Sequence, residues 1–353
     1  MRALATAEQS LSDHDLSQLI TGEAAIQFVQ PKGQSFRAEI VYAQMIDRRV
    51  IEYLILGAAP ESETRLREIW QQHNPEFVVI PDSPGITLKT REKRIIYDLK
   101  TLRIFSVLGH AAWRVFVCHC PHVLLSNWTG TPINAEMLWN DATYPAARDA
   151  FEEFLKVAQD ATKAASVGGI NWPHDLCDIA ADPSTLNTEQ RAIRDLSLIA
   201  IAYAFLHEIR HVMFRHPEQP KVDDPAEELA CDAFARDFLL EHVSDYVANS
   251  REPIDLVLAK RAAAISLGAF AVYELTAPTH RRGSSKYPAF PDRFETLVAL
   301  TALPPDSYFW VFAATLLLAT LRRQNYSAPL HARTPRELCT TLIDIIRTRA
   351  WTP

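Results

Sequence analysis

The segment AFLHEIRHVMFRH, residues 204–216, constrains the fold most, because it places three histidines and a glutamate in an otherwise apolar run. Asn187 followed by Gln190 matches a capping box, which predicts one long helix from about 188 to 215 that carries this segment. Burying polar side chains without partners costs a few kcal/mol each. A metal ion bound by these side chains would offset that cost.

His207, Glu208 and His211 spell His-Glu-x-x-His. On a helix, positions i and i+4 share one face, with Cβ atoms about 5–6 Å apart. Two imidazoles at that spacing can bind one Zn²⁺ at about 2.0–2.1 Å, and Glu208 is then placed to take a proton from the zinc-bound water. The alternative interpretation is a helix with two structural histidines.

The next helix is expected within DDPAEELACDAF, residues 223–234. Asp224 is its expected N-cap, and Pro225 takes the first helical position. Glu227 then falls at the third helical position, where its carboxylate can close a capping box.

Glu228 is free for other work and is the candidate third zinc ligand, since a catalytic zinc needs three protein ligands and one open position. Asp232 lies one turn further on the same face. It can accept a hydrogen bond from the far nitrogen of a ligand histidine. The alternative for both acids is a favourable interaction with the helix dipole.

His-Glu-x-x-His followed by Glu-x-x-x-Asp on the next helix resembles the gluzincin metallopeptidases, the thermolysin-like clan. The resemblance implies that His207, His211 and Glu228 bind Zn²⁺. It also implies that Glu208 is the catalytic base and that Asp232 supports the first histidine.

The string EELACDAFARDFLL also resembles a segment of ImmA/IrrE-type peptidases, with Cys231 in place of their usual alanine. The wider layout resembles the Lit-like phage-exclusion peptidases, family U49. These resemblances rest on residues 204–240 and say nothing about residues 1–165. They imply a narrow protein substrate and a regulated activity in phage defence or stress response.

A later segment, YPAFPDR, has the form Tyr-Pro-x-x-x-x-Arg. Several His-Glu-x-x-His peptidases carry His-Pro-x-x-x-x-Arg at this point. Tyr287 can donate a hydrogen bond to a developing oxyanion, and His280 is a second candidate donor. Arg293 could steady this loop or Glu228. The alternative is a turn with two prolines and a helix start.

The fold class expected is α+β, with a mixed region 1–165 and a mostly helical, zincin-like half 166–353. Residues 76–90 read as strand, turn and second strand. Residues 113–125 read as another strand, on which Cys118 and Cys120 would share a face. A structural metal site there is a weaker alternative to buried small residues, because no second pair is evident.

The charge and cysteine content limit the kinds of binding partner and cellular compartment to be expected. A formal net charge of −7 argues against nucleic acid or an anionic membrane as the main partner. Five scattered cysteines and an N-terminus without a signal-like apolar core favour the cytoplasm.

The sequence thus predicts a zinc-dependent endopeptidase that acts on a specific intracellular protein. It leaves the oligomeric state open. A non-catalytic, zinc-stabilised regulatory protein and a zinc hydrolase of small molecules are the competing interpretations.

Overall fold

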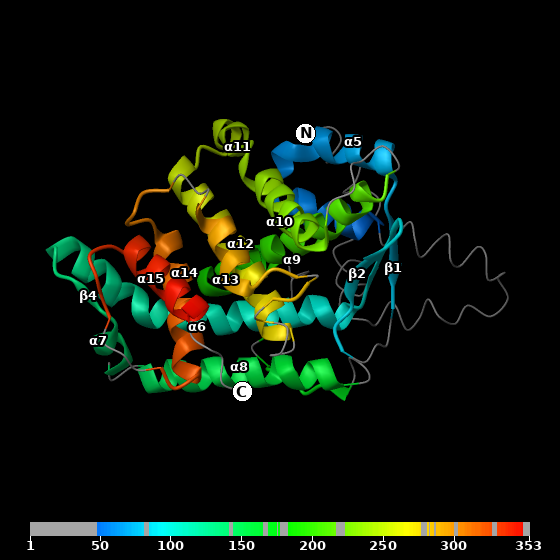
Figure 1. The fold of residues 1–353 in the computed structure, drawn as a ribbon. Coiled ribbons are helices and arrows are strands. Elements are labelled where there is room, and N and C mark those ends of the chain that lie inside the picture. Colours follow the sequence, from blue (N-terminus) through cyan, green and yellow to red (C-terminus); the bar gives the residue numbers. More distant parts are fainter. Residues whose placement is uncertain are drawn as a thin grey trace.

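The computed structural model describes residues 48–80, 85–140, 144–164, 169–174, 176, 183–216, 223–276, 281, 283–285, 287–299, 303–326 and 330–348. These residues are mostly helical, with a small sheet at one end of the helical assembly (Figure 1). At a coarse level this agrees with the expected α+β class.

The helical elements follow residues 48–58, which are also helical. They are η1 (Pro60–Ser62), α5 (Glu63–His73), α6 (Leu99–Thr129), α7 (Ala135–Asn140), α8 (Tyr144–Lys163), η3 (Pro183–Thr185), α9 (Thr188–Phe214), α10 (Asp224–Leu240), α11 (Val243–Ser250), α12 (Ile254–Leu275), α13 (Phe290–Ala299), α14 (Tyr308–Arg323) and α15 (Pro335–Thr348). The strands are β1 (Glu76–Val79), β2 (Leu88–Arg91), β3 (Arg94–Tyr97), β4 (Ile133–Asn134) and β5 (His331–Ala332).

Helix α9 lies at the centre and packs against α6, α10 and α12. Its predicted capping box is confirmed, since the Asn187 side chain accepts from the Gln190 backbone and the Gln190 side chain accepts from the Asn187 backbone. Buried residues occur around its whole circumference, as expected for a helix surrounded by others. This burial fixes the direction in which its histidines point.

The three-stranded sheet has the order β1-β3-β2, with β3 parallel to β1 and antiparallel to β2. Its inner face rests on α9, where the Phe205 ring meets the rings of Tyr97 and Phe77 edge-on at centroid distances of 5.0 and 6.2 Å. The Thr90 hydroxyl donates to the Glu208 carbonyl oxygen at 2.9 Å. Strand β2 is thereby held beside the His-Glu-x-x-His segment.

Helices α9 and α12 are long and apolar enough to cross a membrane by length and composition. In both, 78% of the most apolar window is buried inside the protein. Their neighbours are other helices of the same core, so their composition is explained by packing within the protein.

The predicted strand over 113–125 is wrong, because these residues lie inside α6. Side chains two residues apart on a helix are separated by about 200°, so Cys118 and Cys120 do not share a face. The strands expected in 76–90 exist as β1 and β2, but β3 lies between them in the sheet. The segment belongs to a long apolar run that forms a helix, although its short alternation of polar and apolar residues suggested a strand.

One hydrophobic core includes residues from both sides of position 165, and α6 packs on α9 and α14. Residues 1–47, residues 165–168 at the expected boundary, and His280 lie outside the described residues. A separate role for residues 1–165 stays a prediction.

Candidate active site

Helices α9 and α10 bring three candidate ligands together. The Nε2 atoms of His207 and His211 lie 3.2 Å apart. The two carboxylate oxygens of Glu228 lie 3.3 Å from His207 Nε2 and 3.4 Å from His211 Nε2. All three side chains are only 10–13% exposed. Three possible metal-ligand side chains from two helices therefore face one another.

The other ring nitrogens are held by carboxylates. His207 Nδ1 donates to Asp232 at 2.9 Å, and His211 Nδ1 donates to Glu227 at 2.7 Å. Because a carboxylate accepts, Nδ1 carries the proton of each neutral ring, and the Nε2 lone pairs face Glu228. Both imidazoles are thus oriented as metal ligands usually are.

The role expected for Glu227 is corrected by the start of α10. Asp223, not Asp224, is the N-cap, and its side chain accepts from the Ala226 backbone at 2.9 Å. Glu227 falls one position beyond the capping-box site and faces α9. There its carboxylate bonds His211 and also accepts from Arg215 at 2.8 and 3.2 Å.

Asp232, on α10, is fully buried and joins three helices of the site, α9, α10 and α13. It accepts from Tyr203 Oη at 2.7 Å, from His207, and from Arg293 through Nε and Nη2, each at 2.7 Å. Burial raises the pKa of Asp232, but the Arg293 guanidinium and the His207 hydrogen bond outweigh it and hold that pKa well below its usual range. Arg293, expected to steady its loop or Glu228, instead pairs mainly with Asp232, and its Nη1 lies 3.7 Å from Glu228.

The electrostatics of the site favour a positive charge between the side chains of His207, His211 and Glu228. Burial lowers the pKa of His207, but the adjacent Asp232 and Glu228 carboxylates raise it to about 10. Burial raises the pKa of Glu228, yet His207 and His211 hold it well below its ordinary value. A proton or a metal ion is therefore stabilised where these atoms meet.

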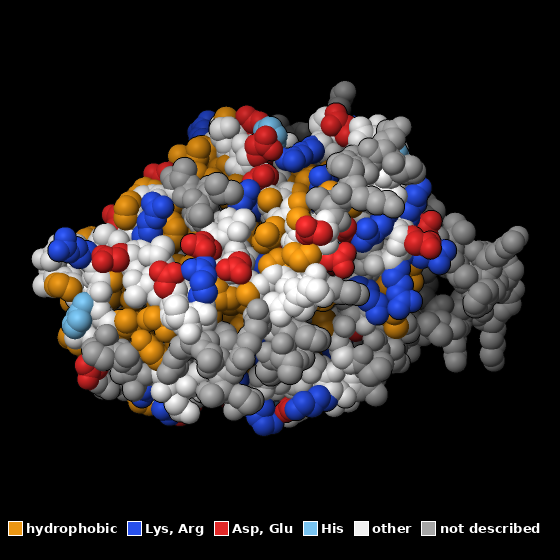
Figure 2. Space-filling view, in the orientation of Figure 1, with side chains coloured by type: hydrophobic (Ala, Val, Ile, Leu, Met, Phe, Trp, Pro, Cys, Tyr) orange, Lys and Arg blue, Asp and Glu red, His pale blue; other side chains and the backbone are white. Residues whose placement is uncertain are grey.

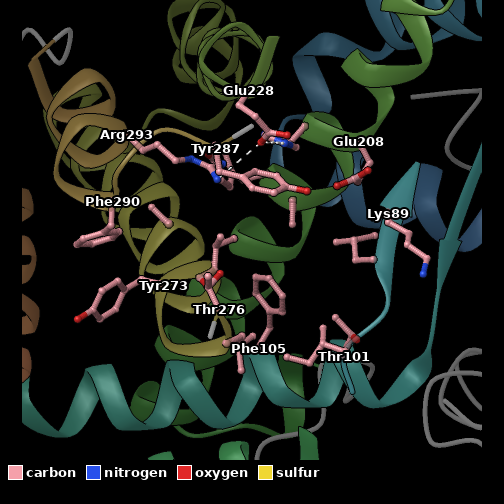
Figure 3. A pocket seen from close by; sticks show the side chains of 18 of the residues that line it. Lys89, Thr101, Phe105, Glu208, Glu228, Tyr273, Thr276, Tyr287, Phe290 and Arg293 are labelled. Carbon is pink, nitrogen blue, oxygen red and sulfur yellow. Dashed lines mark hydrogen bonds and ion pairs between the residues drawn. The ribbon is translucent and has the colours of Figure 1, made fainter. Parts of the chain in front are cut away.

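A cavity of about 440 Å³ opens beside these residues, between α6, α9, α12, β2 and the segment before α13 (Figure 3). Its walls are largely apolar and include Phe105, Val272 and Phe290. The Glu208 carboxylate reaches the cavity, and burial raises its pKa, partly offset by the two histidines. Glu208 is thus available as a proton acceptor beside the converging donors.

Tyr287 also lines the cavity and is 47% exposed. Figure 3 shows its ring lying across the cavity with the hydroxyl directed towards Glu208. A tight turn holds the residue, since the Ser284 backbone donates to the Tyr287 carbonyl at 2.7 Å and Tyr287 N–H donates to Ser284 Oγ. The other candidate donor, His280, lies outside the described residues.

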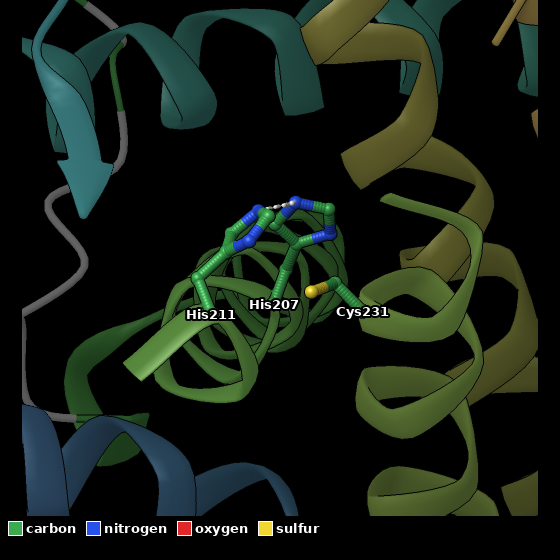
Figure 4. Close-up of side chains that lie close together, drawn as sticks. All are labelled: His207, His211 and Cys231. Carbon is green, nitrogen blue, oxygen red and sulfur yellow. Dashed lines mark hydrogen bonds between the residues drawn. The ribbon is translucent and has the colours of Figure 1, made fainter. Parts of the chain in front are cut away.

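A second possible metal-binding group consists of His207, His211 and Cys231, whose ligand atoms lie within 4.8 Å of one another. Figure 4 shows the Cys231 sulfur pointing from α10 towards α9, away from the point where the Nε2 atoms meet. Burial and the nearby carboxylates raise the pKa of this thiol strongly. Metals bind the thiolate form of cysteine, so a thiol with a raised pKa is a poorer ligand at neutral pH than the ionised Glu228 carboxylate.

The sequence did not predict three hydrogen bonds of the site. The Glu227 bond to His211, the Tyr203 bond to Asp232 and the Thr90 bond to the Glu208 carbonyl were not predicted. Tyr203 lies four residues before His207, so the helical spacing could have indicated a shared face.

A family model described as Peptidase U49 matches residues 99–313. The match begins at α6, ends within α14 and includes every candidate site residue named above except Thr90. Searches of the curated proteins and of the solved structures find no match.

Proposed function

Because the matched region is more than half of its length, the chain belongs to the Peptidase U49 family, and we propose that it is a zinc-dependent endopeptidase of the gluzincin kind. His207, His211 and Glu228 would hold the metal. The observation that carries this proposal is the convergence of these three side chains at the edge of a cavity that Glu208 also lines.

The distances between the possible ligand atoms fit a shared metal ion better than they fit direct hydrogen bonds. Donors about 2.0–2.1 Å from a tetrahedral Zn²⁺ are separated by about 3.3 Å. The two Nε2 atoms lie 3.2 Å apart, and each lies 3.3 or 3.4 Å from a different oxygen of the Glu228 carboxylate. Charge-assisted hydrogen bonds between nitrogen and oxygen are shorter, about 2.7–2.9 Å. Two histidines with one glutamate are also a known donor set of catalytic zinc.

Zinc bound there would polarise the substrate carbonyl and lower the pKa of the attacking water. Glu208 takes the proton of that water and transfers it to the leaving amine, and its raised pKa suits both steps. The Tyr287 hydroxyl donates to the carbonyl oxygen as negative charge develops, with His280 as the competing candidate. Asp232 and Arg293 act through His207 and Glu228 by fixing their orientation.

The substrate is a protein or peptide, as membership of a peptidase family implies. Within the described part of the sheet, β2 is an edge strand, and Leu88 and Lys89 line the cavity. An extended peptide added to that edge would pass beside Glu208. On the resemblance to Lit-like peptidases alone, we extend the proposal to one cytoplasmic protein target in phage defence or stress response.

Glu208→Gln tests the proposal. The matched control is Glu189→Gln, on the same helix but 45% exposed and paired with Arg114. Digestion of a proteome-derived peptide library, read by mass spectrometry, should show cleavage by the wild type and the control. We expect Glu208→Gln to lose at least about 100-fold in rate while keeping its metal, since it removes only the proton acceptor.

Unchanged cleavage by Glu208→Gln would remove this residue from the mechanism. A wild type that carries zinc but cleaves neither the library nor any protein in cells would favour the non-catalytic interpretation.

A further inference from the structure

A second cavity of about 860 Å³ lies on the other side of α10, between α5, α9, α10 and α12. Its floor is apolar and includes Ile69, Phe234 and Leu240. Figure 2 shows apolar side chains reaching the surface over α10, with Lys and Arg side chains nearby. Among the residues that the structure describes, this groove shares none of its lining with the catalytic cavity.

Arg210, between the two histidines in sequence, lines this groove, and none of the described carboxylates pairs with it. Its guanidinium lies 4.3 Å from the centroid of the Phe214 ring and 5.6 Å from that of Phe234. Its Nε is buried and unbonded, and its Nη1 contacts the Met213 sulfur at 3.9 Å. Among the residues that the structure describes, no carboxylate lies within ion-pair distance of it.

A partly buried cation without a counter-ion is costly, and cation–π contacts offset only part of that cost. An anion entering the groove would supply the missing partner. The bond would be charge-assisted, and the guanidinium fork could hold a carboxylate with two hydrogen bonds.

Arg65, from α5, brings a second guanidinium to the same aromatic floor. It lies 5.5 Å from the Phe234 centroid and bonds Glu241 at 2.8 Å. The Glu241 side chain is 56% exposed, so this is a surface ion pair of small net value that an incoming carboxylate can replace.

We propose that this groove binds an acidic segment of a partner protein, in which a carboxylate pairs with Arg210 and adjacent apolar side chains cover the floor. Charge complementarity selects this occupant: three arginines and two acids line the groove, a local positive excess on a chain of net charge −7. A small inorganic anion would leave the apolar floor uncovered. The inference is independent of the metal and of catalysis.

The test is a binding measurement on full-length Glu208→Gln, which avoids cleavage of the probe. The probe is a set of eight-residue peptides that alternate Glu or Asp with Phe or Leu and carry a neutral dye, and fluorescence anisotropy reports their binding. The matched set replaces Glu with Gln and Asp with Asn. We expect the acidic set to bind at least about 10-fold more tightly than the amide set, the value of one charged hydrogen bond.

Arg210→Gln should remove this preference, whereas Arg191→Gln, an exposed change on the same helix, should leave it intact. Glu241→Gln should strengthen binding several-fold, because it frees Arg65. Equal binding of both peptide sets, no binding of either, or an acidic preference that survives Arg210→Gln would overturn the proposal. The comparison between peptide sets does not depend on how well any arginine variant folds.

Discussion

Asp232→Asn removes one negative charge from the most connected buried residue of the site. Asp232 is 0% exposed and accepts four hydrogen bonds, two of them from Arg293. Asparagine keeps one acceptor but turns an amide donor towards the guanidinium. Breaking a buried ion pair by removing one partner costs about 3–5 kcal/mol, because the remaining charge stays buried. We expect a loss of that size in the free energy of unfolding.

The matched control is Asp160→Asn, which removes the charge from an exposed ion pair within α8. Asp160 lies 2.6 Å from Lys156, with the two side chains 51% and 77% exposed. Exposed pairs contribute less than about 1 kcal/mol, so this variant should unfold nearly as the wild type does. Urea unfolding followed by circular dichroism at neutral pH measures both variants.

A second change separates charge from packing. Adding Arg293→Met to Asp232→Asn removes the unpaired cation as well, and the double variant should recover at least about 1 kcal/mol relative to additivity. Equal losses for Asp232→Asn and Asp160→Asn would refute the view that the buried charge of Asp232 stabilises the site.

Three further predictions concern catalysis, pH dependence and packing. Tyr287→Phe should lower kcat about 100-fold or more, with little change in zinc content, if its hydroxyl donates to the oxyanion; an unchanged kcat would leave that role to another donor. Burial raises the pKa of Asp98 despite the hydrogen bond from Thr101 N–H. The Asp98 carboxyl therefore contributes to stability below its unfolded pKa of about 4, and this contribution is lost as pH rises through the folded pKa. In Asp98→Asn the free energy of unfolding should therefore fall less between about pH 4 and pH 7 than it does in the wild type. Parallel pH profiles would contradict this assignment. Gly268→Ala would place a Cβ 2.7 Å from the Tyr203 ring and should cost about 1–3 kcal/mol, whereas Gly57→Ala, with no contact closer than 3.5 Å, should be neutral or stabilising. Similar melting temperatures for the two alanine variants would argue against this close packing.

Local spacing explains what the sequence could predict. The capping box at Asn187 and the helical spacing of His207 and His211 depend on neighbours along one helix. The same holds for Glu228 and Asp232 on α10, one turn apart. Once both helices form, packing of α10 on α9 is sufficient to bring these residues together.

Other features depend on tertiary contacts and could not be read from the sequence. Glu227 was assigned to a capping box because the helix start was placed one residue late, and one residue changes the face by about 100°. Arg293 lies on α13, which is far from α10 in the sequence, and no local pattern specifies its contact with Asp232. Short alternation at 113–125 suggested a strand, but burial within the helical assembly determined the outcome. That no described carboxylate pairs with Arg210 likewise follows only from what packs around it.

The central claim is that two helices hold one catalytic zinc ion through His207, His211 and Glu228. Its most direct test is the zinc content of purified wild type and Glu228→Gln, measured by inductively coupled plasma mass spectrometry after equal exposure to zinc and dialysis. The account predicts about one zinc per chain in the wild type and almost none in the variant, since each lost ligand weakens binding strongly. Equal zinc content in the two proteins, or a wild type that retains none, would contradict it.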